Sequence, residues 1–155
     1  MATQYVHTNI ISNNWQSLAE FYIHVFDCKL LPPERNLSGQ WLADGTGVKN
    51  ASLRGAHLLL PGFDEAGPTL EIFQYHENEE KPLPAANREG FCHIAFHVDD
   101  VEETLEKIVK YGGNKLGQVV HKKFTQGTLI FTYAEDPEGN IVEIQNWNKN
   151  HHEPL

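Results

Sequence analysis

The chain has few cysteines, no long apolar run and fewer basic than acidic residues. Its two cysteines, Cys28 and Cys92, form no CxxC pair, so no disulfide framework is predicted, and a reducing, cytoplasmic setting is expected. No apolar run approaches the roughly 18 residues that span a membrane. The opening segment MATQYVHTNI lacks a basic region followed by an apolar one, so no secretory signal is predicted.

Basic residues are too few for a protein that binds nucleic acid. The chain carries 12 Lys and Arg against 21 Asp and Glu, and its net charge is −9. Phosphate backbones and anionic membrane surfaces both require clustered positive charge, so neither is an expected partner. Its 155 residues fit one domain or two small modules, and the 40% apolar content is near the globular average.

The first half of the chain predicts a strand, a helix and further strands. YVHTNII (5–11) is rich in β-branched residues, and Ser12-Asn13-Asn14 offers N-cap side chains. WQSLAEFYIHVFDCKLL then shows apolar residues at helical spacing, and Pro32-Pro33 is expected to end the regular structure beyond it. Short strands are predicted at 40–42, 51–60 and 69–75, separated by Gly- and Pro-containing turns.

The second half repeats this order after the polar segment 76–90. FCHIAFHV predicts a strand, and a helix follows over VEETLEKIVKYGG with Asp99 or Asp100 as its cap and Gly at its end. KLGQVVHKKF, TLIFTYAED and NIVEIQNW predict three more strands, with a turn at 136–139. We expect a first module at 1–80, a linker at 81–90, and a second module with a polar tail at 91–155, in one compact structural unit.

An internal repeat relates the two halves. A shift of 86 residues places His7 on His93, Asn13-Asn14 on Asp99-Asp100, and Lys29-Leu30 on Lys115-Leu116. Each half therefore reads β-α-β-β-β. The predicted fold class is α+β, built from two βαβββ modules.

Ionisable side chains occur inside apolar strands of both modules. His7 and His93 lie in the first strand of each module, and Glu71 and Glu143 lie in the last. Such residues are costly in apolar strands unless they are paired or ligated. If the modules pair, these four side chains can converge on one divalent metal such as Ni, Co, Fe, Mn or Zn. Four protein ligands leave two octahedral positions for a substrate with adjacent oxygens, which the metal polarises as a Lewis acid.

Four segments carry a resemblance to a known family: HTNIISNNWQSLAEFYIHVF, TLEIFQY, GFCHIAFHVDDVEETLEKI and EDPEGNIVEIQNW. They resemble the vicinal oxygen chelate superfamily of glyoxalases, bleomycin-resistance proteins and extradiol dioxygenases. The resemblance implies paired modules whose curled mixed sheets enclose a central metal cleft, often in a homodimer. The set of His7, Glu71, His93 and Glu143 is most like that of bacterial glyoxalase I, which favours Ni or Co, with Zn, Mn or Fe as alternatives.

The same resemblance implies an activity, a lyase or isomerase that moves a proton between adjacent carbons of a chelated substrate. Glu143 would be the base, with Glu71 as the mirrored alternative. Bacterial glyoxalase I usually has arginine where this chain has Ile11 and asparagine where it has Tyr75, and its arginine contacts glutathione. The proton chemistry therefore carries over better than the glutathione substrate.

Three alternatives stay open within the superfamily. An Fe(II) extradiol-type dioxygenase would use His7, His93 and Glu143, and the acidic Glu71 counts against it. An epimerase would commonly have Gln at position 71. A resistance-type protein would bind a small molecule without metal or turnover. The presence of all four ligand-type residues argues against this alternative.

A second group of residues is expected to shape a substrate pocket. His97 shares the strand face of His93, and Phe73 and Tyr75 follow Glu71 along its strand. Arg88 could anchor an anionic substrate group at the cleft mouth. His57 could line the same cleft, but strand surface is the favoured interpretation.

Overall fold

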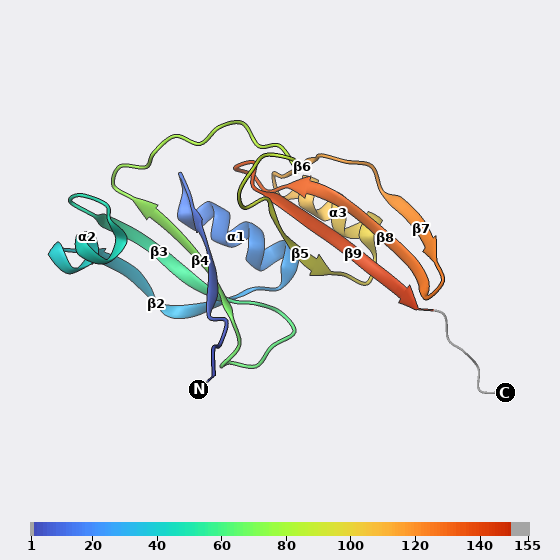
Figure 1. The fold of residues 1–155 in the computed structure, drawn as a ribbon, viewed down its shortest axis with the longest axis horizontal. Helices are drawn as coiled ribbons and strands as arrows, with labels where there is room; N and C mark the ends of the chain where they lie inside the picture. The colour runs from blue at the N-terminus through green and yellow to red at the C-terminus, as the bar shows by residue number, and fades with distance from the viewer. Residues whose placement is uncertain (1, 150–155) are drawn as a thin grey trace. The chain divides into compact units, whose positions relative to one another are not determined.

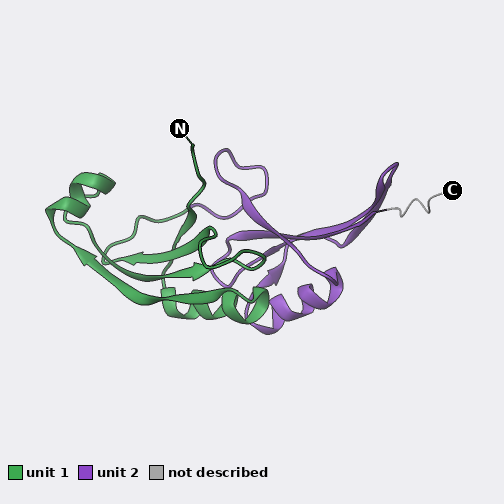
Figure 2. Ribbon diagram, turned by 90° about the horizontal axis from the view of Figure 1, so that it is seen from below, with its two compact units in different colours: residues 1–81 green, residues 82–155 purple. Residues whose placement is uncertain are grey.

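The computed structural model describes residues 2–149. The chain divides into two compact units, residues 1–81 and 82–155 (Figure 2). Each unit has its own mixed sheet and its own long helix, which confirms the predicted α+β class. Between residues 2 and 149 no helix is both long and apolar enough to cross a membrane.

Unit 1 joins a four-stranded sheet to two helices (Figure 1). Its elements are, in order, β1 (His7–Ile11), α1 (Trp15–Phe26), β2 (Lys29–Ser38), α2 (Gln40–Thr46), β3 (Ser52–Leu59) and β4 (Thr69–Tyr75). The strand order is β1-β4-β3-β2, with β1 parallel to β4 and the other neighbours antiparallel. The first and last strands of the unit are therefore neighbours.

Helix α1 begins at the predicted cap and covers one face of this sheet. The side chain of Asn14 accepts a hydrogen bond from Ser17 N at 3.2 Å, and Asp27 ends the helix in the left-handed conformation. The helix packs on β3 and β4, where Leu58 and Ile72 are fully buried. Side chains alternate between the two faces of a strand, so Glu71 and His57 point to the face opposite α1.

The prediction that Pro32-Pro33 ends regular structure is wrong. Strand β2 passes through both prolines, which are joined by a cis peptide bond. β2 lies at the edge of the sheet, and its pairing with β3 shifts register between Leu31 and Arg35. Proline has no N–H to donate, and an edge strand with a local irregularity tolerates that loss.

The predicted strand at 40–42 is also wrong, because α2 occupies those residues. Gly39, at φ 116°, leads into the helix, and Gly47, at φ 73°, ends it by donating its N–H to Ala43 O at 2.9 Å. Leu42 is buried with Leu53 of β3. Three residues are too few to show a helical or a strand period, so the sequence pattern could not distinguish the two.

Unit 2 has a five-stranded sheet and one helix. Its elements are, in order, β5 (His93–His97), α3 (Val101–Lys110), β6 (Asn114–Lys115), β7 (Val120–Phe124), β8 (Gly127–Glu135) and β9 (Ile141–Lys149). The strand order is β5-β9-β8-β6, and β7 also pairs with β8. β5 is parallel to β9, as β1 is to β4 in unit 1.

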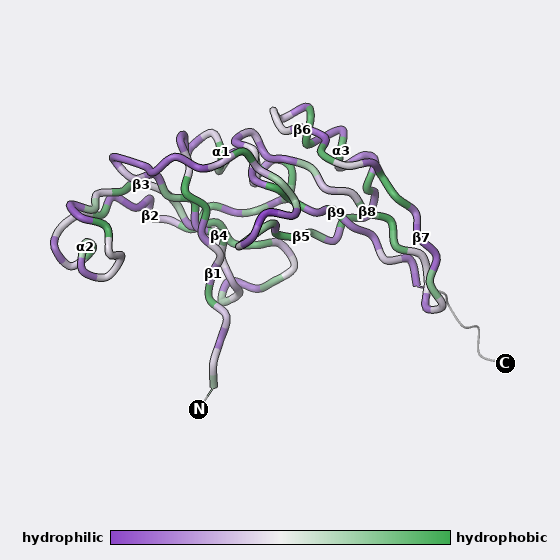
Figure 3. Tube along the Cα trace, turned by 45° about the horizontal axis from the view of Figure 1, so that its top comes forward, coloured by the Kyte–Doolittle hydropathy of each residue, from purple (hydrophilic) through white to green (hydrophobic). Residues whose placement is uncertain are grey.

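The helix and the edge of unit 2 follow local signals. Asp100 caps α3 by accepting from Glu103 N at 2.8 Å, and Gly112, at φ 97°, follows its C-cap. Hydrophilic and hydrophobic residues alternate along this amphipathic helix (Figure 3). The single strand predicted over 115–124 is wrong, because regular pairing with β8 is interrupted between β6 and β7. At the interruption Leu116 N and Gly117 N both donate to Tyr133 O, at 3.3 and 3.0 Å.

Candidate functional site

In unit 1 the candidate ligands stand on neighbouring strands. Register pairs Asn9 of β1 with Glu71 of β4, and Glu71 with His57 of β3. We call Asn9, Glu71 and His57 the unit 1 row. Residues in register on adjacent strands point to the same side of a sheet. His7 lies two residues before Asn9, so it shares that side.

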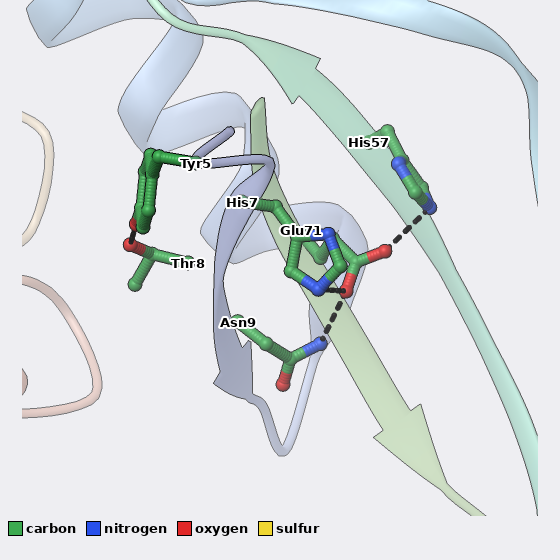
Figure 4. A network of polar contacts seen from close by, with 6 residues as sticks. All are labelled: Tyr5, His7, Thr8, Asn9, His57 and Glu71. Atoms are coloured by element: carbon green, nitrogen blue, oxygen red, sulfur yellow. Dashed lines mark hydrogen bonds and ion pairs between the residues drawn. The ribbon is translucent and has the colours of Figure 1, made fainter. Parts of the chain in front are cut away.

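The carboxylate of Glu71 is surrounded by donors (Figure 4). His7 Nε2 lies 3.0 Å from Oε1, and Asn9 Nδ2 donates to the same oxygen at 3.3 Å. His57 Nε2 lies 2.8 Å from the other oxygen, Oε2. Glu71 is only 7% exposed. Three polar partners compensate the charge that burial would otherwise make costly.

His57 is the functional candidate that the sequence ranked too low, since the favoured interpretation as strand surface is wrong. Its side chain is 20% exposed and touches Glu71. Burial lowers the pKa of His57, Arg35 and His7 act in the same direction, and the charge of Glu71 opposes them. The neutral imidazole is therefore favoured, and its single N–H can be donated to Glu71.

Unit 2 contains the equivalent row with different side chains. Register pairs Ala95 of β5 with Glu143 of β9, and Glu143 with Tyr133 of β8. These three residues are the unit 2 row. His93 Nε2 lies 3.4 Å from Glu143 Oε2, and the side chains are 26% and 16% exposed. Each unit thus brings an imidazole from its first strand to a carboxylate on its last strand.

The surroundings of His93 differ from those of His7. Its Nδ1 lies 3.3 Å from Cys92 Sγ, and its ring centroid lies 4.6 Å from that of Tyr133. Burial raises the pKa of Tyr133, and the nearby Glu143 and Cys92 raise it further. The phenol therefore stays protonated beside the carboxylate.

Two of the predicted pocket residues lie on the same face as Glu71. The ring centroid of Phe73 is 5.6 Å from that of His57. A Cβ on Gly55 would lie 2.7 Å from Phe73 Cδ1, so the absence of a side chain at Gly55 makes room for this ring. Tyr75 packs on the cluster of Leu42, Ala51 and Leu53.

The other two predicted pocket residues lie outside the unit 1 row. His97 is exposed on β5, in register with Gln145. Arg88 is exposed in the segment before β5, and its Nη2 donates to Leu83 O at 2.7 Å. These observations leave both pocket roles as predictions.

Unit 1 also has two hollows that reach Tyr75. One, of about 790 Å³, is lined by Trp15, Arg35 and Arg54 among others. The second, of about 770 Å³, runs past Ile11 and the turn after α2. Tyr75 therefore lines both hollows, whereas the unit 1 row lines neither.

The donor types in each unit fit a divalent metal. Two ligands about 2.1 Å from one ion and at right angles to each other lie about 3.0 Å apart. That is the separation of His7 Nε2 and Glu71 Oε1, 3.0 Å. Over residues 2–149 no three His, Cys, Asp or Glu side chains are grouped to hold an ion. His57 does not complete such a group, because it contacts the opposite oxygen of Glu71.

The fold of two βαβββ-like units is shared with proteins of known structure. The sequence profile of the Glyoxalase/Bleomycin resistance protein/Dioxygenase superfamily matches residues 4–144. The chain belongs to this superfamily.

Within the superfamily, the chain is similar in sequence to proteins named as lactoylglutathione lyases. Lactoylglutathione lyase of Neisseria meningitidis is 26% identical over 139 residues, which cover 90% of this chain and 87% of the relative. A probable lactoylglutathione lyase of Synechocystis is 36% identical over 55 residues, or 36% of this chain and 40% of the relative.

Solved structures show the same fold. A glyoxalase family protein from Bacillus cereus superposes with a TM-score of 0.75 at 17% identity, covering 94% of this chain and 93% of that one. A glyoxalase family protein from Enterococcus faecalis superposes with a TM-score of 0.56 at 21% identity, covering 94% and 97%.

Proposed function

We propose that this protein is a metal-dependent lyase or isomerase of the glyoxalase I type. It would move a proton between adjacent carbons of a substrate that offers two adjacent oxygens. One observation carries the proposal: each unit brings an imidazole nitrogen close to a carboxylate oxygen. The distance is 3.0 Å in unit 1 and 3.4 Å in unit 2. His7, Glu71, His93 and Glu143 would together bind one divalent ion, with Ni or Co favoured.

The likeness to lactoylglutathione lyases supports the reaction class. The substrate would differ from that of the lactoylglutathione lyases in the part of the molecule that glutathione contributes there. Position 11 is an isoleucine that is 44% exposed, so it offers no charge to a substrate carboxylate. Tyr75 is held in the apolar cluster with Leu53. We therefore propose a hemithioacetal or a related hydroxycarbonyl compound, with the thiol portion left open.

The two carboxylates would have different tasks. The bound metal supplies Lewis-acid polarisation of the two substrate oxygens. Glu143 would take the proton from one carbon and return it to the next, as a general base and then a general acid. In the described part of the chain its carboxylate has one donor partner, His93, so an oxygen is left to accept a proton. Glu71, with three donors, suits the role of a fixed ligand.

Elemental analysis of the purified protein tests the site first. Wild type should retain about one equivalent of metal, and His93→Ala and Glu71→Gln should lose it. His121→Ala is a matched control, because His121 also lies 3.4 Å from a glutamate, Glu102, but both side chains are more than half exposed. The control should bind metal like wild type.

The activity assay then separates the alternatives. Hemithioacetal isomerisation that depends on the added metal would support the proposal. Metal loss in His93→Ala alone, together with oxygen consumption, would replace it with a three-ligand dioxygenase. A protein that takes up no Ni, Co, Zn, Mn or Fe would contradict it and favour a binding protein.

A further inference from the structure

His57 lies at the centre of the unit 1 sheet and belongs to none of the four proposed ligands. It stands on β3 in register with Glu71, and its Nε2 is 2.8 Å from Glu71 Oε2. Its ring centroid is 6.4 Å from that of His7, in an edge-on arrangement. Figure 4 shows the two imidazoles on opposite sides of the carboxylate.

The three partners of Glu71 divide its two oxygens between them. His7 and Asn9 contact Oε1, and His57 contacts Oε2 (Figure 4). Rotation of the carboxylate about its last side-chain bond would break contacts on both oxygens at once. Oε1 is therefore kept facing His7, the residue with which it would share a metal.

His57 is itself held in place by its neighbours. Its side chain is 20% exposed, and Phe73 packs against its ring with centroids 5.6 Å apart. A donor on a packed ring of a strand is held in a more precise position than a donor on a loop. The donor is thus fixed before any ligand arrives.

Unit 2 has a different side chain at this position. Tyr133 occupies in the unit 2 row the place that His57 occupies in the unit 1 row. Its ring packs on His93 with centroids 4.6 Å apart. The contact with a carboxylate oxygen at 2.8 Å is thus a feature of unit 1, and the four-ligand repeat does not require it.

We infer that His57 is a positioning residue that holds the Glu71 carboxylate in the orientation needed to ligate a metal. The inference rests on the proposed function, because it assumes that Glu71 is a ligand. Partners that hydrogen-bond a metal ligand fix its direction, and their loss typically weakens metal binding 10- to 100-fold. His57 would do this for Glu71 without touching the ion.

Cobalt(II) affinity, measured by competition with a chelator, tests the inference. His57→Leu should weaken binding about 10- to 100-fold. His57→Gln keeps an N–H donor of similar reach and should stay within a few-fold of wild type. In a Glu71→Gln background, His57→Leu should have little further effect, because the partner that it positions is gone. His121→Leu, which removes an exposed histidine, controls for surface binding of cobalt.

The outcomes separate this inference from the proposed function. Wild type that binds no cobalt(II) would overturn both. Wild type that binds while His57→Leu binds equally tightly would overturn only the role of His57. A loss in His57→Leu that His57→Gln does not restore would also overturn it, because packing of the ring, and not its N–H donor, would then explain the loss.

Discussion

The two units place a carboxylate at the same point of the same sheet, but they surround it differently. In unit 1 Glu71 stands between Asn9 and His57 and also meets His7. In unit 2 Glu143 stands between Ala95, which has no polar side chain, and Tyr133. The backbone repeat thus fixes where the carboxylate lies, and the flanking side chains decide how firmly it is held.

This difference suits a division of labour between two otherwise equivalent glutamates. Glu71 is 7% exposed, and its three polar partners offset the cost of burying its carboxylate. Glu143 is more accessible, and His93 at 3.4 Å is a looser partner than His57 at 2.8 Å. A residue that takes up and releases a proton needs this freedom, and a metal ligand does not.

The largest expected effect comes from replacing each glutamate by its amide. Glu143→Gln should lower kcat about 10²- to 10⁴-fold at saturating metal, because the proposed general base is lost. Glu71→Gln should mainly weaken metal binding, and excess metal should restore much of its activity. Steady-state kinetics over a metal titration distinguishes the two.

Two outcomes of these kinetic measurements would contradict the proposed roles of the glutamates. If Glu71→Gln lost kcat irrecoverably and Glu143→Gln lost only metal affinity, Glu71 would be the base, and the donor-rich carboxylate would be the reactive one. Equal losses in both variants would contradict the division of labour.

Local signals in the sequence predicted much of this fold. Asn14 and Asp100 cap their helices as expected, and β4 has the predicted bounds. These features depend on neighbouring residues only: a cap needs a short polar side chain, and a strand needs a run of apolar residues. The superfamily followed from the same local segments and is confirmed.

Long-range register could not be predicted in this way. The strands predicted at 51–60 and 69–75 leave the hairpin pairing uncertain by one residue. The observed pairing, Leu59 with Thr69, places His57 beside Glu71, whereas a slip of one would place Leu58 there. A slip of one residue moves every side chain to the other face of a sheet. The sequence alone therefore could not decide between the cleft and the strand surface for His57.

The two units also differ in how deeply each buries its cysteine, and we expect this difference to have a smaller effect, on the pH dependence of stability. Cys28 of unit 1 is 2% exposed, and burial together with Asp27 raises its pKa from 9.0 to about 12. Cys92 of unit 2 is partly exposed and donates to Ala86 O at 3.2 Å. Above pH 9 the unfolded chain releases the Cys28 proton and the folded chain retains it. Rising pH therefore favours unfolding between the two pKa values.

Urea unfolding measured from pH 7 to 10.5 checks this sign. The free energy of unfolding of wild type should fall above pH 9, with this thiol contributing at most about 1.4 kcal/mol per pH unit. Cys28→Ala should be less stable at pH 7 but should lose that part of the slope. Cys92→Ala should keep the wild-type slope. An unchanged slope in Cys28→Ala would show that its thiol ionises without unfolding.

We expect the smallest effect from a substitution that copies one contact of unit 1, Asn9 with Glu71, into unit 2. Ala95 is exposed and faces Glu143 in register as Asn9 faces Glu71. Ala95→Asn should give Glu143 an amide donor and reduce kcat about tenfold, the effect of one modest charge-assisted hydrogen bond. Ala95→Leu adds similar bulk without a donor and should change kcat less. Wild-type kcat in Ala95→Asn would mean that freedom from donors is not what distinguishes Glu143 from Glu71.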